Sequence, residues 1–545
     1  MASRLRSGAR LVFNHATKHT GVGIICAVAY FDPGNWGVDL QAGSEFGYKL
    51  LFVVLLAGLI AVYMQVLASR LGCVTGLDLA AHCRLLLHDR PKHTWAWRWL
   101  ALYPLYALAE VAIISTDLAE LLGSAMALCM LFPQLPLWAG VLLTASDVLI
   151  LLALRDPLRG KPVRLFELMI AALVFTVLVC MAIIVSQAGV HWGQAFDGFV
   201  PSSALFKSGA LYTSIGILGA TVMPHSLFLG SALATQDRVS SKGDILYDAS
   251  IALAKPIPSL DSNILPSAFA KKCASTVLRK FKRSVCSVFQ ILPVESEEGR
   301  PKSHAERSNN CLSFIRAHLW HGIVDMVISL LGLAVVINSL ILILAGAEFH
   351  RSSDNPATLF DAYDLLQDRI GVSGATLFAL ALLASGQSSS IVATMAGQTV
   401  SEGFLQWRIS PVLRRLLTRL LGLVPSMAVA VALGRAGIAT LLVTSQVILS
   451  IVLPFMIFPL IYLTSSRNIM SVKKSQPEPI PITPAVVLQS TSPEGHMEIG
   501  ESLQLPDEFV DFSNGRFTMC LGYVIWLAIV VANVYAIVTL ATGQE

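Results

Sequence analysis

Long apolar runs constrain this chain more than any other feature of its sequence. A helix needs about 20 mostly apolar residues to cross the hydrocarbon core of a bilayer. Clear candidates are 50–69, 99–123, 135–154, 165–187, 319–347, 373–397, 416–434, 437–463 and 517–541. Two further runs, 20–46 and 207–233, are interrupted near their middle by Pro, Gly or polar residues. Charged residues make up only 14% of the chain, against about 25% in soluble domains. The sequence therefore predicts an all-α polytopic membrane protein with eleven transmembrane helices.

Basic residues alternate between successive connections of these runs. Lys and Arg occur before the first run and in the connections 70–98, 155–164 and 234–317, whereas 124–134 and 188–206 contain none. Cytoplasmic loops carry the excess of Lys and Arg, so the N-terminus is predicted to be cytoplasmic. Omitting either interrupted run would destroy the alternation, which supports both as real spans.

The positions of the two interrupted runs, first and sixth, suggest an internal repeat. Runs one to five and six to ten would form a 5+5 repeat, and the second repeat is inverted because five is an odd number. The predicted organisation is a cytoplasmic tail, two inverted repeats with a long basic cytoplasmic loop in the second, a flexible cytoplasmic linker and a last span. These correspond to residues 1–19, 20–187, 188–463 with the loop 234–317, 464–515 and 516–545.

Both interruptions place potential metal ligands near mid-depth. The first run reads AVAYFDPGNWGVDLQAG and contains Asp32 and Asn35, and the second reads ILGATVMPHSLFLGSA and contains Ala220, Met223 and His225. Proline removes a backbone N–H, and the carbonyl that it frees inside a membrane must be satisfied by protein, water or an ion. Paired interruptions of this kind mark the midplane site of a transporter. A thioether beside carboxylate, amide and carbonyl oxygens favours manganese or ferrous iron over calcium or magnesium.

Three acidic residues share one face of the third run, 99–123. Glu110 and Asp117 lie about 20° apart around the helix, and Glu120 lies about 60° beyond Asp117. Acids inside a membrane are typical of a proton relay. They could equally form structural ion pairs with the arginines of 414–419, and both roles can hold at once.

Other polar residues are predicted to have smaller roles. Asp147 and Asp325 are expected to form interhelical hydrogen bonds. Asn338 either braces the metal site or bonds to a neighbouring helix. The histidines of the predicted cytoplasmic loops are expected to be solvated: His82, His88, His93 and His304.

The segments around both interruptions resemble the signature segments of the Nramp family of proton-coupled divalent metal transporters. These segments are AYFDPGNW followed by DLQAG, and GATVMPHSLFLGSAL. Further similar motifs are LGCVTGLDLA, AEVAIISTDLAELLG, VINSLILILAGAEF, SGQSSSIVATMAGQTVSEGF and SQVILSIVLPF. The resemblance covers most of 20–463, fails over 234–317, 464–515 and the last run, and is greatest to fungal members.

This resemblance implies a LeuT-like fold that works by alternating access. It implies that the metal is bound by Asp32, Asn35, the Ala220 carbonyl and Met223, and that Gln446 joins them as the site closes.

The resemblance also implies a proton route through Asp117, Glu120 and Arg415, with His225 beside the metal. Many bacterial members have a second His five residues after the His of MPH. Gly230 stands there in this chain, so the proton role of that second His cannot be transferred.

The leading hypothesis is a secondary active transporter, not an enzyme, that imports Mn²⁺, Fe²⁺, Cd²⁺ or Co²⁺ by symport with protons. The metal would be a substrate, and no cofactor is expected. Two alternatives are a sodium-coupled amino-acid symporter of the same fold, which would not need Met223, and a membrane receptor that binds metal without moving it. The HExxH and GxSxG motifs of a protease are absent, and a net charge of +4 is too small to indicate nucleic acid. The lipid bilayer could be the plasma membrane or an endosomal or vacuolar membrane.

Overall fold

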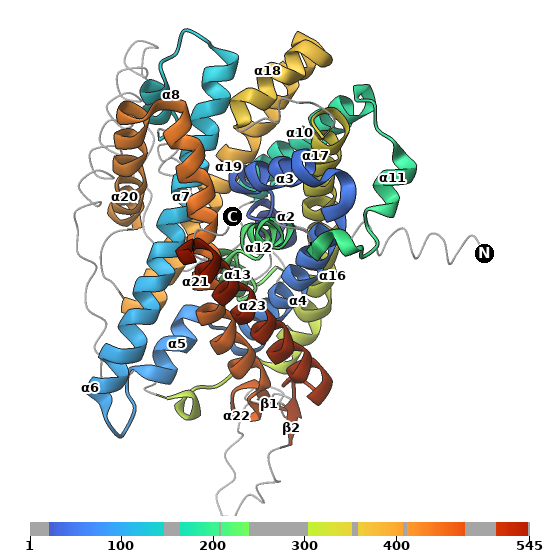
Figure 1. Cartoon of the computed structure of the whole chain (residues 1–545). Coiled ribbons are helices and arrows are strands. Elements are labelled where there is room, and N and C mark those ends of the chain that lie inside the picture. The colour runs from blue at the N-terminus through green and yellow to red at the C-terminus, as the bar shows by residue number, and fades with distance from the viewer. Residues whose placement is uncertain are drawn as a thin grey trace, which may run out of the picture.

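The computed structural model describes residues 21–145, 164–206, 209–238, 303–350, 358–406, 411–474 and 508–542. Helices predominate in these ranges, and Figure 1 shows them gathered into one bundle. Eight helical stretches in the described ranges are long and apolar enough to cross a membrane, and Leu416–Ala432 is a shorter apolar helix. The predicted all-α membrane architecture is therefore confirmed, while the number of eleven spans stays a prediction.

The first predicted span consists of two helices, α2 (Val22–Val28) and α3 (Pro33–Phe46). Asp32 begins α3, because its side chain accepts a hydrogen bond from the backbone N–H of Asn35. Pro33 occupies the first position of α3, where a helix does not need a backbone N–H. The sequence Asp-Pro-Gly-Asn is thus both the interruption and the start signal of the second half-helix.

The sixth predicted span is broken in the same way, into α12 (Ala210–Thr221) and α13 (Pro224–Leu233). Pro224 begins α13, and Val222 and Met223 form the break. Both predicted interruptions are therefore confirmed.

The other helices surround these two broken spans. Those in the first half of the chain are α4 (Leu51–Thr75), α5 (Leu79–Leu87), α6 (Thr94–Trp97), α7 (Tyr103–Leu131), α8 (Leu137–Thr144), α10 (Arg164–Gln187) and α11 (Trp192–Asp197). Those in the second half are α16 (Leu312–Ser329), α17 (Val336–Glu348), α18 (Leu359–Arg369), α19 (Val372–Leu405), α20 (Pro411–Ala432), α21 (Gly434–Ser465), α22 (Arg467–Met470) and α23 (Arg516–Thr542). Short 3₁₀ or π turns are η1 (Gly47–Leu50), η2 (Arg98–Leu102), η3 (Ser203–Phe206), η5 (His304–Glu306) and η6 (Leu330–Val335). The remainder of the predicted fourth span, including Asp147, lies outside the described residues.

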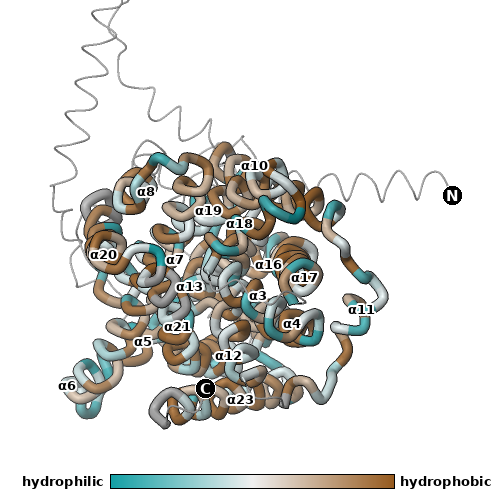
Figure 2. The backbone as a smooth tube through the Cα atoms, turned by 45° about the horizontal axis from the view of Figure 1, so that its top comes forward, coloured by the Kyte–Doolittle hydropathy of each residue, from teal (hydrophilic) through white to brown (hydrophobic). Residues whose placement is uncertain are grey.

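Apolar side chains cover the outside of the bundle as well as filling its centre. Figure 2 shows hydrophobic residues along outer helices such as α23, and Phe175, Val424 and Val531 are each more than 60% exposed. In the centre, Trp36 is fully buried, and its indole N–H donates to the Phe31 carbonyl at 3.2 Å. An apolar exterior of this extent suits lipid rather than water.

The two segments predicted to be cytoplasmic and flexible are ordered at their ends. After α21 and α22, β1 (Ser471–Lys473) pairs antiparallel with β2 (Phe509–Asp511), which immediately precedes α23. Before α16, the amide groups of Asn310 donate to the carbonyls of Cys73 and Val74 at the end of α4. The prediction of flexibility was wrong for these ends, because they satisfy backbone groups that helix termini leave unpaired. Residues 239–302 and 475–507 lie outside the described part of the chain.

The expectation that His82 and His304 are solvated was also wrong. Their rings stack with centroids 5.1 Å apart, and His82 Nδ1 lies 2.9 Å from His304 Nε2. His82 Nε2 lies 2.8 Å from Thr75 Oγ1, and Arg307 donates to the Thr75 carbonyl. Burial lowers the pKa of both histidines, and the nearby charges of Arg307 and, for His304, Arg90 lower it further. Through Thr75, these contacts of His82, His304 and Arg307 hold the segment before α16 against the end of α4.

Candidate metal site and proton route

Asn35 joins the two broken spans at their interruptions. Its side-chain Nδ2 donates to Asp32 Oδ1 at 2.8 Å and to the Ala220 carbonyl at 3.0 Å. The same Asp32 oxygen accepts from the Asn35 backbone N–H at 2.9 Å, while Asp32 Oδ2 has no hydrogen-bond partner among the described residues. Asp32 and Asn35 are at most 1% exposed. A buried carboxylate and a backbone carbonyl thus converge on one small polar group.

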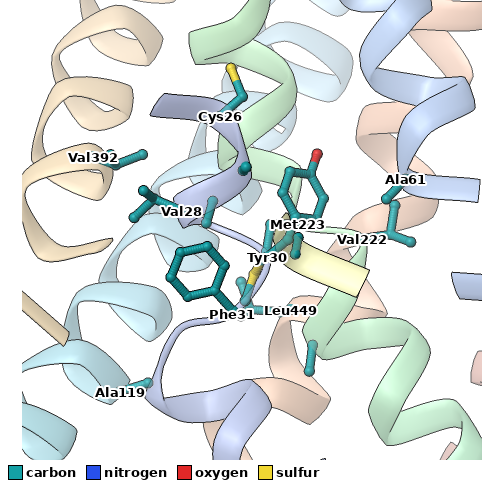
Figure 3. Close-up of a cluster of buried hydrophobic side chains, with 14 of the residues drawn as sticks. Cys26, Val28, Tyr30, Phe31, Ala61, Ala119, Val222, Met223, Val392 and Leu449 are labelled. Carbon is teal, nitrogen blue, oxygen red and sulfur yellow. The ribbon is translucent and has the colours of Figure 1, made fainter. Parts of the chain in front are cut away.

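The Ala220 carbonyl faces this point because Pro224 follows four residues later. A residue at that position of a regular helix would donate its N–H to the Ala220 carbonyl, but proline has none. Met223, directly before Pro224, is fully buried. Figure 3 shows it in an apolar cluster with Tyr30, Phe31 and Leu449, so apolar side chains surround both breaks.

Gln446 of α21 lies against the first turn of α3. A Cβ added to Gly34 would collide with the Gln446 side-chain amide, so the two helices meet here at the closest distance that glycine permits. Gln446 Nε2 donates to Ser445 Oγ at 3.3 Å, and its Oε1 has no partner among the described residues. The Gln446 Oε1 therefore lies beside Gly34, the residue directly before Asn35, and is available as a ligand.

Asn338 and Ser385 support the first break from neighbouring helices. Asn338 Nδ2 donates to the Tyr30 carbonyl at 2.7 Å, and Ser385 Oγ donates to the Phe31 carbonyl at 2.6 Å. Asn338 thus bonds to the broken helix itself. Asp325 forms the interhelical bond predicted for it, since its Oδ2 accepts from the Gly23 N–H at 2.7 Å.

His225 connects the second break to α7. Its Nδ1 lies 3.3 Å from Thr116 Oγ1, and its Nε2 has no hydrogen-bond partner among the described residues. His225 is 1% exposed. The sequence identified His225 but not Thr116, which carries no signal of its own in an apolar helix.

Two of the three acids of α7, Asp117 and Glu120, are buried, and Glu110 is half-buried. Asp117 forms an ion pair with Arg419 of α20, which also bonds to Ser390 of α19. Glu110 lies in a groove between α7 and α20 instead. The shared helix face is therefore divided between two environments.

Glu120 lies between the metal ligands and this ion pair. Its carboxyl group interacts electrostatically with Asp32 on α3 and with Asp117 and Arg419. A Cβ at Gly123, one turn beyond Glu120, would overlap Pro33, so α7 packs directly on the start of α3. The acids thus form a short series that begins beside the first break.

Arg419 is part of this series, and the role that the family motifs imply for Arg415 stays a prediction. The Arg415 side chain lies outside the described residues, and Arg419, one turn later on the same helix face, is the arginine paired with Asp117. Sequence reasoning included Arg419 only as a structural partner. It also passed over Asp39, a carboxylate of α3 that is 1% exposed and interacts electrostatically with Asp32.

The position of the missing second histidine is filled from α4. A Cβ at Gly230 would collide with the side-chain amide of Gln65. Gln65 accepts from the Tyr30 hydroxyl at 3.1 Å and donates to the Ser226 carbonyl at 3.3 Å. A neutral amide that links the two broken spans therefore stands where an imidazole would have to fit.

Among the described residues, no group of three or more His, Cys, Asp or Glu could hold a metal ion. The cluster around Asn35 offers a different set of atoms, from one carboxylate, amides, a carbonyl and a thioether. Together with the two broken helices, it defines the class of protein as a membrane transport protein.

The family model described as "Natural resistance-associated macrophage protein-like", Nramp, matches residues 23–254 and 302–480. The chain belongs to the Nramp family, a family of metal ion transporters rather than enzymes. The match extends into 234–254, 302–317 and 464–480, where the motifs alone had indicated none.

Curated relatives and solved structures agree with this assignment. The chain is 40% identical over 531 residues to the manganese transporter pdt1 of Schizosaccharomyces pombe, covering 96% of this chain and 86% of that protein. It is 36% identical over 535 residues to the iron transporter SMF3 of Saccharomyces cerevisiae, covering 97% of each. A crystal structure of the manganese transporter of Eremococcus coleocola matches with a TM-score of 0.65 and 27% identity, covering 95% of this chain and 86% of that one. The predicted family and fold class are confirmed.

Proposed function

We propose that this chain carries divalent transition-metal ions across the membrane by symport with protons, with Mn²⁺ and Fe²⁺ as substrates and Cd²⁺ and Co²⁺ also accepted. The observation that carries the proposal is the position of the Asn35 Nδ2 between Asp32 Oδ1 and the Ala220 carbonyl. An electropositive group that links two oxygens from opposite breaks occupies the place of a cation.

A metal ion would take over this linking role. Turning the Asn35 amide presents its Oδ1 to the ion. Asp32 supplies the negative charge, which is costly to bury without a partner cation. The Met223 thioether would favour transition metals over calcium and magnesium. Gln446 would close the site with its spare oxygen.

The proton would move through the acids of α7. Glu120 is in electrostatic contact with Asp32, so binding of a divalent cation at Asp32 favours release of a proton from Glu120. Asp117 and Arg419 lie further along the same route. For symport, the proton displaced from Glu120 must leave through Asp117 towards the side of the membrane to which the metal moves.

The test is uptake of manganese-54 into proteoliposomes that contain the full chain. Asp32→Ala removes the carboxylate proposed to bind the metal and should abolish saturable uptake at an unchanged protein level. Asp364→Ala on α18, which removes an exposed carboxylate, is the matched control and should transport normally. Saturable manganese uptake by the Asp32→Ala protein would dismiss the proposed site.

A further inference from the structure

Pro454 leaves one backbone carbonyl in the middle of α21 without its helical donor. The residue four positions after Ser450 is Pro454, which has no N–H to give to the Ser450 carbonyl. At membrane depth such a carbonyl must find a donor within the protein. Asn533 of α23 supplies it, because Asn533 Nδ2 donates to the Ser450 carbonyl at 2.7 Å.

The contact between Asn533 and Ser450 is a reciprocal pair. The Ser450 hydroxyl donates to Asn533 Oδ1 at 2.6 Å, so both polar atoms of the amide are used. Asn533 is 5% exposed, whereas its neighbours Val531 and Val534 are more than half exposed. One polar side chain of this largely apolar helix is therefore turned inward onto the turn of α21 that contains Pro454.

A second residue of α23 bonds to the other end of the same turn. The indole N–H of Trp526 donates to the Pro454 carbonyl at 3.0 Å. Helix α23 is therefore hydrogen-bonded to α21 at both Ser450 and Pro454, and Figure 1 shows where the two helices cross.

The turn of α21 from Ser450 to Pro454 lies next to the proposed metal site. Ser450 follows Gln446 by one helical turn, and a Cβ added to Gly219 of α12 would come within 2.5 Å of the Ser450 Cβ. Gly219 directly precedes Ala220, whose carbonyl is a proposed ligand. A cavity of about 30 Å³, lined in part by Gln446, Ser450 and Asn533, leaves space for this turn to shift.

We propose that Asn533 is a positioning residue for metal transport, which holds α21 in the bent form that brings Gln446 to the ion. This inference rests on the proposed transport function. A backbone N–H at position 454 would bond to the Ser450 carbonyl and hold α21 straight. The Asn533 side chain donates to that carbonyl from another helix, so α21 can bend while the carbonyl keeps a hydrogen bond. Helix α23 then takes part in closing the site although it contributes no ligand.

Asn533→Leu, which keeps the size but removes both hydrogen bonds, should lower the maximal rate of manganese uptake by about tenfold, the effect of leaving one buried acceptor unsatisfied. The affinity of the detergent-solubilised protein for Mn²⁺ should change by less than about twofold. Val534→Ala, a lipid-facing neighbour, serves as the matched control and should leave both quantities unchanged.

Pro454→Ala separates positioning from a general loss of structure, because it returns the backbone N–H to the Ser450 carbonyl. In the Pro454→Ala background, Asn533→Leu should lower the rate no further. A loss of equal size in both backgrounds, or full activity of Asn533→Leu alone, overturns the proposal. Manganese uptake by the unaltered protein is measured in the same liposomes, and its absence would count against the transport function instead.

Discussion

Replacing Asp117 by Asn tests whether the acids of α7 serve the proton or only the structure. Asp117 and Arg419 are 2% and 4% exposed, so the substitution removes from a buried guanidinium the carboxylate that is paired with it. Removing one partner of a buried ion pair costs about 3–5 kcal/mol. This corresponds to a change of roughly a hundredfold to several thousandfold in the ratio of folded to unfolded protein. We therefore expect Asp117→Asn to be markedly less stable than the unaltered protein.

The double variant Asp117→Asn with Arg419→Gln removes both charges and distinguishes the two roles. The double variant leaves no buried charge without a partner, so most of the lost stability should return. Coupling of manganese uptake to proton movement should not return, because a proton relay needs a group that gains and loses a proton, and an amide side chain does neither. Both variants should still move manganese, while stimulation by an inward pH gradient falls sharply.

The assay is manganese uptake into liposomes at equal and unequal pH, with an internal pH dye that reports proton entry, alongside thermal unfolding in detergent. Asp364→Asn on the surface of α18 is the control. If the Asp117→Asn protein keeps full gradient stimulation and metal-evoked acidification, the relay hypothesis is wrong. If the double variant is as unstable as the single one, the ion pair is not the source of the lost stability.

Three further predictions concern residues described above. Met223→Ala should weaken cadmium uptake more than manganese uptake and admit calcium or magnesium, as measured by competition; unchanged cadmium uptake would exclude sulfur as a ligand. Gly230→His should reduce the amount of folded, transporting protein, because its Cβ meets the Gln65 amide, and Gln65→Ala should restore it; a fully active Gly230→His protein would contradict this packing. Protection against hydrogen exchange at the His82–His304 contact, corrected for the pH dependence of the intrinsic exchange rate, should fall as pH drops below about 6.5, the ordinary pKa of histidine. Burial in the contact lowers the pKa of both histidines, so the contact is fully formed above pH about 6.5 and weakens as pH falls towards the lowered pKa values. His82→Gln should remove this pH dependence.

Local signals in the sequence were sufficient to predict the broken helices. Pro33 and Pro224 each begin a half-helix, and proline acts on the backbone within four residues, whatever the rest of the chain does. Asp32 and Asn35 could be placed at the first break for the same reason.

Contacts between distant segments could not be predicted in this way. The choice of Arg419 as partner of Asp117 depends on the rotation of α20 against α7, which nothing local specifies. The burial of His82 depends on His304, 222 residues later in the chain. Asn533 could not be recognised either, because its partner Ser450 lies 83 residues earlier in the chain.

The β1–β2 ribbon has a consequence for how this chain tolerates change. Ser471 pairs with Asp511 and Lys473 with Phe509, and Lys474 forms an ion pair with Glu508, so the chain departs and returns at neighbouring points. Arg70 of α4 secures this ribbon by donating to the Phe512 carbonyl at 2.6 Å. Closing a loop costs only about 0.6 kcal/mol more for each doubling of its length. Insertions between the two strands should therefore change the free energy of packing α23 against the bundle very little. A fluorescent reporter, an epitope or a degradation signal could be inserted at this position of the transporter.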